Sequence, residues 1–220
     1  MLAFDTATPV VTVALHDGTR VLSEETAAGA RRHAELLAAM IERVLAAGRV
    51  ERTDLEAIAV GTGPGPYTGL RAGVVTARVL ASALRIPAVG VCTLDVMARA
   101  AARAAAGREF IVAADARRKE VYWARYGHAA QRVGEPAVGS PAALASAASC
   151  PVAGEGPVLY PELFPSPIPP SYPDAADLAE IAARRLAEHD PPGLPEPLYL
   201  RRPDAREPGP PKRVTAGTTS

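Results

Sequence analysis

Short apolar runs rich in β-branched residues alternate along this chain with longer stretches of helical periodicity. Residues 2–6, 10–15 and 20–25, separated by turns, predict three consecutive strands, which is typical of an antiparallel meander. Residues 31–47 predict a helix, because apolar pairs recur there every four residues. Gly48 provides a stop for this helix.

The next elements extend the same lobe. Residues 55–60 predict a buried strand, which is followed by a glycine- and proline-rich loop and a second helix over residues 70–84. A strand over residues 88–92 and a helix over residues 94–106 complete the first half. A three-stranded meander followed by helix, strand, helix and strand matches half of an actin-like fold, which sugar kinases and chaperone ATPases share.

The second half begins like the first. Residues 110–115 predict a strand ending in Asp115, as the opening strand ends in Asp5, and residues 121–126 predict its hairpin partner. The patterns that follow predict a strand over residues 131–136, a helix over 141–148, a short strand at 152–153 and an amphipathic helix over 174–188. The repeated opening is consistent with an internal duplication.

These elements predict an α/β protein with a two-lobed actin-like (sugar kinase/chaperone ATPase) fold, each lobe a mixed five-stranded sheet flanked by helices. The first lobe is expected at residues 1–107 and the second at residues 108–202. Residues 203–220 are rich in proline, glycine and threonine, so we expect a disordered tail there.

Composition narrows the classes of function. The chain has 220 residues, 48% of them hydrophobic, and its 24 basic residues balance 24 acidic ones. A protein that binds nucleic acid unaided usually carries a basic excess, so this chain is not expected to hold RNA alone. Cys92 and Cys150 lack metal-ligand spacing and fit a reducing compartment. With no apolar run of about 18 residues and no signal peptide, we expect a soluble, cytoplasmic protein without a membrane partner.

The loop GTGPGPYTGL at residues 61–70 carries the strongest local signal. It lies between a predicted strand and a predicted helix, where free amides at the helix start can cradle a phosphate. No Gly-Lys-Ser/Thr follows, as a Walker loop requires, and Pro66 stands where a dinucleotide fingerprint has its third glycine. A structural tight turn is therefore favoured, with a phosphate contact as the alternative.

The turn after the first predicted strand offers candidates for nucleotide binding. In actin-like ATPases an acid at this point helps to position metal and nucleotide, and Asp5, followed by Thr6 and Thr8, occupies that place. The turn contains no glycine, and Pro9 removes an amide donor, which weakens the case for ATP. The structural alternative is that Asp5 accepts hydrogen bonds from backbone amides of its own turn.

Histidine spacing argues against a metal site. Two histidines four positions apart on a helix can hold one metal ion, because both imidazoles then lie on one face. The four histidines of this chain are His16, His33, His128 and His189, and no two are separated in that way. We predict no metal and no cofactor, and assign His33 to packing or capping near a helix start.

Several segments resemble one known family, in register along the chain. The segment GPGPYTGLRAG at residues 63–73 is similar to the signature stretch of the TsaB (YeaZ-like) family. The resemblance continues in FDTAT at residues 4–8, RHAELL at 32–37, DARRKEVY at 115–122 and PLYLR at 197–201. These segments span most of the chain, and their common order makes coincidence a poor explanation.

The resemblance implies a role in partnership rather than catalysis. The TsaB family supplies the non-catalytic, dimerising subunit of the bacterial machinery that makes threonylcarbamoyladenosine (t6A) beside the anticodon of tRNAs reading ANN codons. The implied partners are the catalytic relative TsaD, in a heterodimer, the ATPase TsaE, in a larger complex, and tRNA, indirectly through that complex. Without TsaD, the same surface could support a homodimer.

The dimer interface is expected on the helices predicted at residues 31–47 and 70–84. The side chains assigned to it are His33, Leu36, Leu37, Met40, Ile41, Val44, Tyr67, Leu70, Arg71, Val74, Val75 and Arg78. They are expected to be shared between the protein's own core and a helix bundle with TsaD. The alternative is that the apolar face of the first helix packs entirely on the protein's own sheet.

Two further readings remain as alternatives. A stand-alone actin-fold ATPase or phosphotransferase would need a phosphate loop, a metal-binding acid and a catalytic base, and only Asp5 is a good candidate for any of these. The basic turn Arg117-Arg118-Lys119 could contact tRNA phosphate or an acidic partner, although a solvated turn is favoured.

Overall fold

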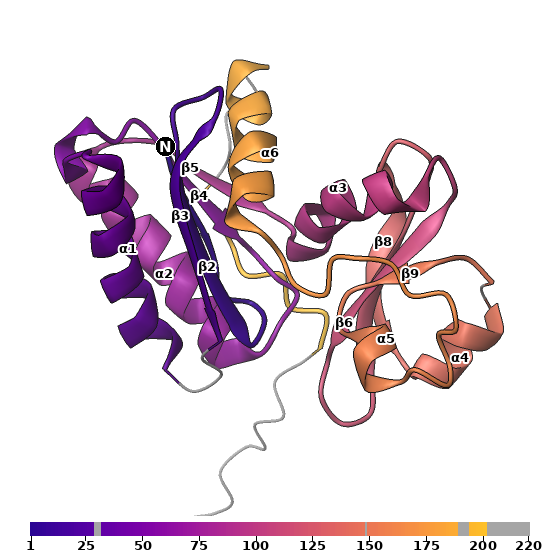
Figure 1. Cartoon of the computed structure of the whole chain (residues 1–220). Coiled ribbons are helices and arrows are strands. Elements are labelled where there is room, and N and C mark those ends of the chain that lie inside the picture. The colour runs from indigo at the N-terminus through magenta and orange to yellow at the C-terminus, as the bar shows by residue number, and fades with distance from the viewer. Residues whose placement is uncertain (29–31, 148, 189–193, 202–220) are drawn as a thin grey trace, which may run out of the picture.

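The structure is a computed structural model that describes residues 1–28, 32–147, 149–188 and 194–201. The described residues form two lobes, each a β-sheet with helices on its faces (Figure 1). The tail predicted at residues 203–220 lies outside them. No helix in these four ranges has both the length and the apolar character needed to cross a membrane.

The first lobe is built on a five-stranded sheet of order β3-β2-β1-β4-β5. Its strands are β1 (Leu2–Asp5), β2 (Val10–His16), β3 (Val21–Ala28), β4 (Ile58–Gly61) and β5 (Ala88–Val91). The first three form the predicted antiparallel meander, and the last two add in parallel to β1. A short 3-10 turn, η1 (Arg52–Asp54), precedes β4.

Helices cover both faces of this sheet. They are α1 (His33–Gly48) and α2 (Tyr67–Leu84) on one face and α6 (Ala175–Ala187) on the other (Figure 1). Phe4 and its register partner Val13 lie in the core beneath α1 and α2. The adjacent pair Ala3 and Ala14 lies in the core beneath α6, because successive side chains of a strand point to opposite faces. The inner strands are therefore continuous apolar runs.

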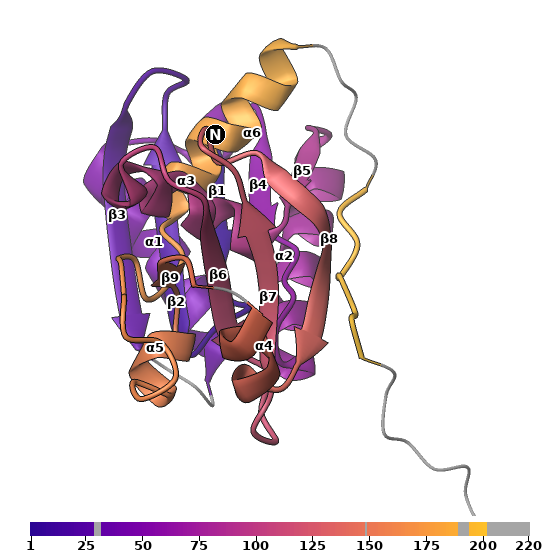
Figure 2. The same cartoon turned by 90° about the vertical axis from the view of Figure 1, so that its right-hand side faces the viewer.

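The second lobe has four strands rather than the predicted five, in the order β8-β7-β6-β9. They are β6 (Phe110–Asp115), β7 (Val121–Tyr126), β8 (Arg132–Gly139) and β9 (Val152–Ala153), and the first three lie side by side in Figure 2. Beyond β9, Pro167 pairs with Val152 only as an isolated bridge. The segment 161–173 carries six prolines, which lack the amide donors that a fifth strand needs.

The remaining helices are α3 (Thr93–Ala105), α4 (Pro141–Ala147) and α5 (Gly156–Leu159). α3 joins the two lobes. Its Met97 packs with Phe110 and Tyr126 of the second sheet, whereas its Val96 belongs to the core beneath α6. Figure 1 accordingly shows α3 between α6 and the second sheet.

The predicted division at residue 108 assigns α6 to the second lobe, but α6 packs on the first sheet. Its Leu178 and Ala179 are fully buried against Ala59 and Val89. The chain thus returns to the first lobe after completing the second. The amphipathic pattern of residues 174–188 predicts a buried face, and only tertiary packing decides which sheet buries it.

Candidate functional site

Asp5 ends β1 and is fully buried. Its Oδ1 accepts a hydrogen bond from the Ala7 amide at 2.7 Å, and its Oδ2 accepts one from Thr93 Oγ1 at 2.7 Å. Burial raises the pKa of Asp5 above its ordinary value, while the bonds from Thr93 and Ala7 act in the opposite direction. The Asp5 carboxyl group thus accepts a hydrogen bond from an amide of its own turn, which was the structural alternative to a role in nucleotide binding.

The glycine loop packs directly against Asp5 and the turn that follows it. A β-carbon at Gly61 would lie 1.8 Å from Asp5 Oδ2, and one at Gly65 would lie 2.0 Å from the Ala7 carbonyl oxygen. Only glycine permits so close an approach of the two segments. The loop therefore serves to bring the start of α2 onto the β1–β2 turn.

The hydroxyl groups of the nucleotide candidates Thr6 and Thr8 are also occupied. Thr6 Oγ1 donates to the Gly69 carbonyl oxygen at 2.7 Å, and Thr8 Oγ1 lies within hydrogen-bond distance of the Val10 amide and carbonyl. Both threonines are buried. Asp5, Thr6 and Thr8 thus lie together in one turn, and their polar groups hold the turn and the loop in place.

A pocket of about 290 Å³ lies beside this turn. Among the described residues that line it, Arg32, His33 and Arg117 stand with a single acid, Glu35, so this lining is basic. Within the four described ranges, no group of three or more His, Cys, Asp or Glu residues is placed to hold a metal ion. The pocket suits an anion better than a cation.

His33 opens α1 and fastens it to the first sheet. Its Nε2 lies 2.9 Å from the Thr8 carbonyl oxygen. A carbonyl can only accept, so Nε2 carries the proton and donates. His33 therefore anchors the start of α1 to the β1–β2 turn and does not cap the amides of its own helix.

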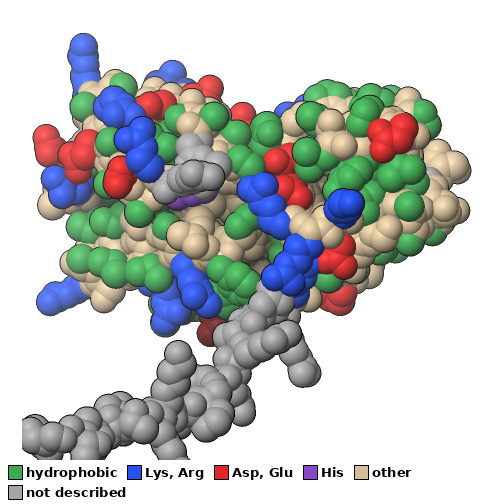
Figure 3. All heavy atoms as spheres, turned by 90° about the horizontal axis from the view of Figure 1, so that it is seen from below, with side chains coloured by type: hydrophobic (Ala, Val, Ile, Leu, Met, Phe, Trp, Pro, Cys, Tyr) green, Lys and Arg blue, Asp and Glu red, His purple; other side chains and the backbone are tan. Residues whose placement is uncertain are grey.

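The basic turn Arg117-Arg118-Lys119 joins β6 to β7 and contributes Arg117 to the lining of this pocket. Arg117 pairs with Asp115, with 3.0 Å between Nη1 and Oδ2, and its amide donates to Asp115 Oδ1 at 2.7 Å. Seen from below, basic side chains gather at the narrowing between the two lobes (Figure 3). The carboxylate of Asp115 offsets part of this positive charge.

The predicted dimer interface is wrong for the side chains of α1 and α2 that face the first sheet. Six of the twelve assigned residues are buried in the protein's own core: Leu37, Met40, Ile41, Val44, Leu70 and Val74. A partner cannot contact them without unpacking that core. They lie on the inward faces of α1 and α2, and helical periodicity alone cannot distinguish a face that packs on a sheet from one that packs on a partner.

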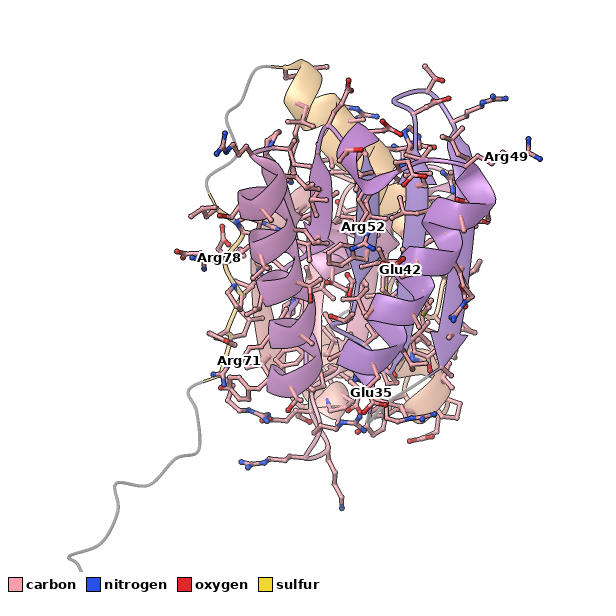
Figure 4. All side chains as sticks on the ribbon, turned by 90° about the vertical axis from the view of Figure 1, so that its left-hand side faces the viewer. Glu35, Glu42, Arg49, Arg52, Arg71 and Arg78 are labelled. Atoms are coloured by element: carbon pink, nitrogen blue, oxygen red, sulfur yellow. The ribbon has the colours of Figure 1, made fainter. Side chains whose placement is uncertain are left out.

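The outward face of α2 is different. Val75 is 57% exposed and Val79, one turn later, is 60% exposed. Arg71 and Arg78 project from the outer edge of α2, and Glu35 and Glu42 from α1 (Figure 4). Val79 was not among the residues predicted for the interface, although its four-residue spacing from Val75 places it on the same helix face.

An aromatic cluster marks the start of α2. The Arg71 guanidinium lies over the rings of Tyr67 and Tyr199, 5.3 and 5.5 Å from their centroids, and its Nε donates to the Tyr199 hydroxyl at 2.8 Å. Tyr67 donates through its hydroxyl to the Arg201 carbonyl at 2.7 Å. The PLYLR resemblance pointed to the segment of Tyr199, but nothing in the sequence indicated that it would lie against α2.

The closing segment also joins the lobes. The Leu198 amide donates to the Thr62 carbonyl at 2.8 Å in the first lobe. Arg201 reaches the second lobe, where Nη1 donates to the Ala116 carbonyl at 3.2 Å and the guanidinium pairs with Glu120. Residues 194–201 thus hold the glycine loop against the β6–β7 hairpin.

Comparisons with known proteins agree with this architecture. The family model described as "TsaD: tRNA N6-adenosine threonylcarbamoyltransferase" matches residues 20–160. An uncharacterized protein of Mycobacterium tuberculosis (strain ATCC 25618 / H37Rv) is 43% identical over 210 residues, which are 94% of this chain and 93% of that protein. The tRNA threonylcarbamoyladenosine biosynthesis protein TsaB of Escherichia coli (strain K12) is 40% identical over 127 residues, 57% of this chain and 54% of that protein.

Solved structures extend the similarity to the whole fold. YeaZ from Pseudomonas aeruginosa superposes with a TM-score of 0.77 at 32% identity, covering 90% of this chain and 98% of that one. The two-lobed actin-like fold is therefore shared with YeaZ over nearly the whole length of that protein. On these grounds the chain belongs to the TsaB (YeaZ-like) family, among the proteins that the TsaD family model matches.

Proposed function

We propose that this protein is the accessory subunit for threonylcarbamoylation of the adenosine beside the anticodon in tRNAs reading ANN codons. In this role it forms a heterodimer with TsaD in the cytoplasm, joins TsaE in a larger complex, and meets tRNA through that complex. The name of the Escherichia coli relative and the TsaD family model support a place in t6A synthesis. The exposed valine pair on α2 supports a role in association.

A non-catalytic role accounts for the state of the β1–β2 turn. A metal- or nucleotide-positioning acid needs a free carboxylate facing the ligand, whereas both oxygens of Asp5 accept hydrogen bonds inside the protein. A β-carbon at Gly61 would clash with Asp5, so a ligand has no access from that side. The catalytic metal and nucleotide chemistry is then assigned to TsaD.

The expected interface is narrower than the sequence indicated. It centres on Val75 and Val79 with the half-buried Leu36, and Arg71 and Arg78 flank it. Exposed apolar side chains on neighbouring helix turns form a strip that a partner helix can cover. Without TsaD, a second copy of this chain could cover the same strip.

Association with TsaD tests this proposal. Val75→Asp and Val79→Asp each place a charge on the strip and should weaken co-purification with TsaD and lower t6A formation in a reconstituted assay. Val158→Asp is the matched control, because Val158 is 64% exposed but lies on α5 in the other lobe. Retention of TsaD by both strip variants would place the interface elsewhere.

The rival function is a stand-alone actin-fold ATPase or phosphotransferase. The basic pocket beside the β1–β2 turn is the one observation that favours it. Calorimetry of the isolated chain with ATP and magnesium separates the two proposals. Tight binding with turnover would support the enzyme, and absence of turnover with an intact association with TsaD would support the accessory subunit.

A further inference from the structure

A second basic pocket lies away from α1, α2 and the β1–β2 turn. Its volume is about 300 Å³, and its lining includes Arg99 of α3, Arg132 of β8, and Arg184 and Arg185 of α6. We call it the arginine pocket. Among the described residues that line it, Asp95 is the only acid. The pocket is lined from α6 of the first lobe, β8 of the second and α3, which joins the two lobes. Figure 1 shows α3 next to α6.

Hydrogen bonds or ion pairs within the protein hold three of its guanidinium groups, those of Arg132, Arg185 and Arg99. Arg132 Nη1 lies 3.0 and 2.9 Å from the two Asp95 oxygens, and Asp95 also accepts from the Tyr126 hydroxyl at 2.8 Å. Arg185 Nη1 donates to the Gly90 carbonyl at 2.8 Å. Each of these contacts uses only one of the five donors of a guanidinium, so most remain for a ligand.

Arg99 is fixed in the same way from α6. Its Nε lies 3.1 Å from Asp177 Oδ1, and it also pairs with Glu180. Arg103, one turn farther along α3, shares Asp177 at 3.0 Å. A side chain held by such pairs loses less rotamer freedom when it binds a ligand.

Positive charge is in excess at this point. Arg184 is exposed, and its side chain has no hydrogen bond or ion pair with any residue of the described ranges. Together with Arg103, five arginines face three carboxylates, Asp95, Asp177 and Glu180. The chain as a whole is neutral, so the surplus is a local property of this pocket.

We propose that the arginine pocket binds a phosphate group. Guanidinium forks match the geometry of phosphate oxygens, and convergence of several from separate elements favours a compact, multiply charged anion over a single carboxylate. The phosphate can come from an RNA backbone or from a free phosphorylated small molecule, which offer the same chemistry. The proposal does not depend on the partnership with TsaD.

The test uses the full chain with two probes, pyrophosphate and a short single-stranded RNA, at low ionic strength. At least one should bind, with backbone amide shifts at Ala129 and Ala130, which line the pocket. Arg184→Gln and Arg132→Gln should each weaken binding about tenfold or more, since a lost charge-assisted bond is worth about 1.5 kcal/mol or more. Added salt should weaken RNA binding if phosphates are the contact.

Arg52→Gln is the matched control. Arg52 is an exposed arginine paired with Glu42 on the face of α1 and α2 (Figure 4), and its loss should leave both affinities unchanged. Displacement of the RNA by pyrophosphate assigns the site to backbone phosphates, and binding of pyrophosphate alone assigns it to a small molecule. Binding of neither probe, or equal weakening by Arg52→Gln, overturns the proposal. Co-purification of Arg184→Gln with TsaD should be unaffected, so this test fails or succeeds separately from that of the proposed function.

Discussion

Thr93 Oγ1 donates to Asp5 Oδ2 at 2.7 Å, which joins the first residue of α3 to the last residue of β1 across 88 positions of the chain. The same hydroxyl oxygen accepts from the Gly63 amide at 3.1 Å. One buried hydroxyl therefore ties the opening strand, the signature loop and the helix between the lobes. Because the Ala7 amide donates to Oδ1, both oxygens of the Asp5 carboxyl group accept hydrogen bonds within the protein.

The ionisation of Asp5 should appear in the pH dependence of stability. Because burial raises the folded-state pKa of Asp5 above 3.8, the folded state holds its proton to higher pH than the unfolded chain. The contribution of Asp5 is therefore fully present below pH 3.8 and is lost as the pH rises through the folded-state pKa. Asp5→Asn should remove this loss. Denaturant unfolding of variant and wild type across that range measures the difference, and a difference independent of pH would contradict the prediction.

Thr93→Val should destabilise the protein through lost hydrogen bonds rather than lost volume. It leaves the Gly63 amide without its acceptor and Asp5 Oδ2 without its donor, at a cost of about 1–3 kcal/mol in the free energy of unfolding. Thermal and chemical denaturation give the value. Thr68→Val on the exposed start of α2 is the control and should be nearly neutral. Equal effects at both positions would show that the bonds of Thr93 carry no weight.

Gly65→Ala should disrupt the loop. The added β-carbon would lie 2.0 Å from the Ala7 carbonyl oxygen, so a backbone segment must move, and we expect a loss of about 2 kcal/mol or more. Gly139→Ala provides the comparison, because its nearest neighbour would be Trp123 Nε1 at 3.9 Å, an ordinary contact. Unfolding midpoints of the two variants decide the matter. A Gly65→Ala protein as stable as Gly139→Ala would mean that the loop does not need this close approach.

Arg71 and Tyr199 should be energetically coupled. A double-mutant cycle with Arg71→Ala and Tyr199→Ala should give an interaction energy of about 0.5–1 kcal/mol, the range for an exposed cation–π contact. The cycle that replaces Arg71→Ala by Arg78→Ala should be additive, since Arg78 lies two turns farther along α2. Unfolding free energies supply all the terms, and additivity in the first cycle would show that the closing segment contributes nothing here.

The sequence predicted most elements to within a few residues. The strands at residues 110–115 and 121–126 match β6 and β7, because an apolar run bounded by a turn leaves little freedom in its local structure. β8 extends to Gly139, beyond the predicted residue 136. Its first four residues are exposed, so only pairing with β7 defines the strand.

The sequence placed Asp5, Thr6 and Thr8 in one turn but did not predict what this turn contacts. Asp5 and Thr6 lie against the glycine loop, because β1 and β4 are parallel and end at the same edge of the sheet. The hydrogen bonds between Asp5 and Thr93 and between Thr6 and Gly69 were not predictable, because each joins residues more than 60 positions apart. The contact of Tyr199 was missed because a long-range contact leaves no local signal, whereas the four-residue spacing of Val79 from Val75 could have identified Val79.

Local patterning by itself determined the order of the elements, the actin-like class and the family signature at residues 63–73, because each depends on neighbours in the chain. Only the tertiary structure decided that α6 returns to the first sheet, that half of the assigned interface is core, and that both carboxyl oxygens of Asp5 accept hydrogen bonds within the protein. Periodicity shows that a helix has an apolar face, but which surface buries that face depends on the shape of the assembled lobes.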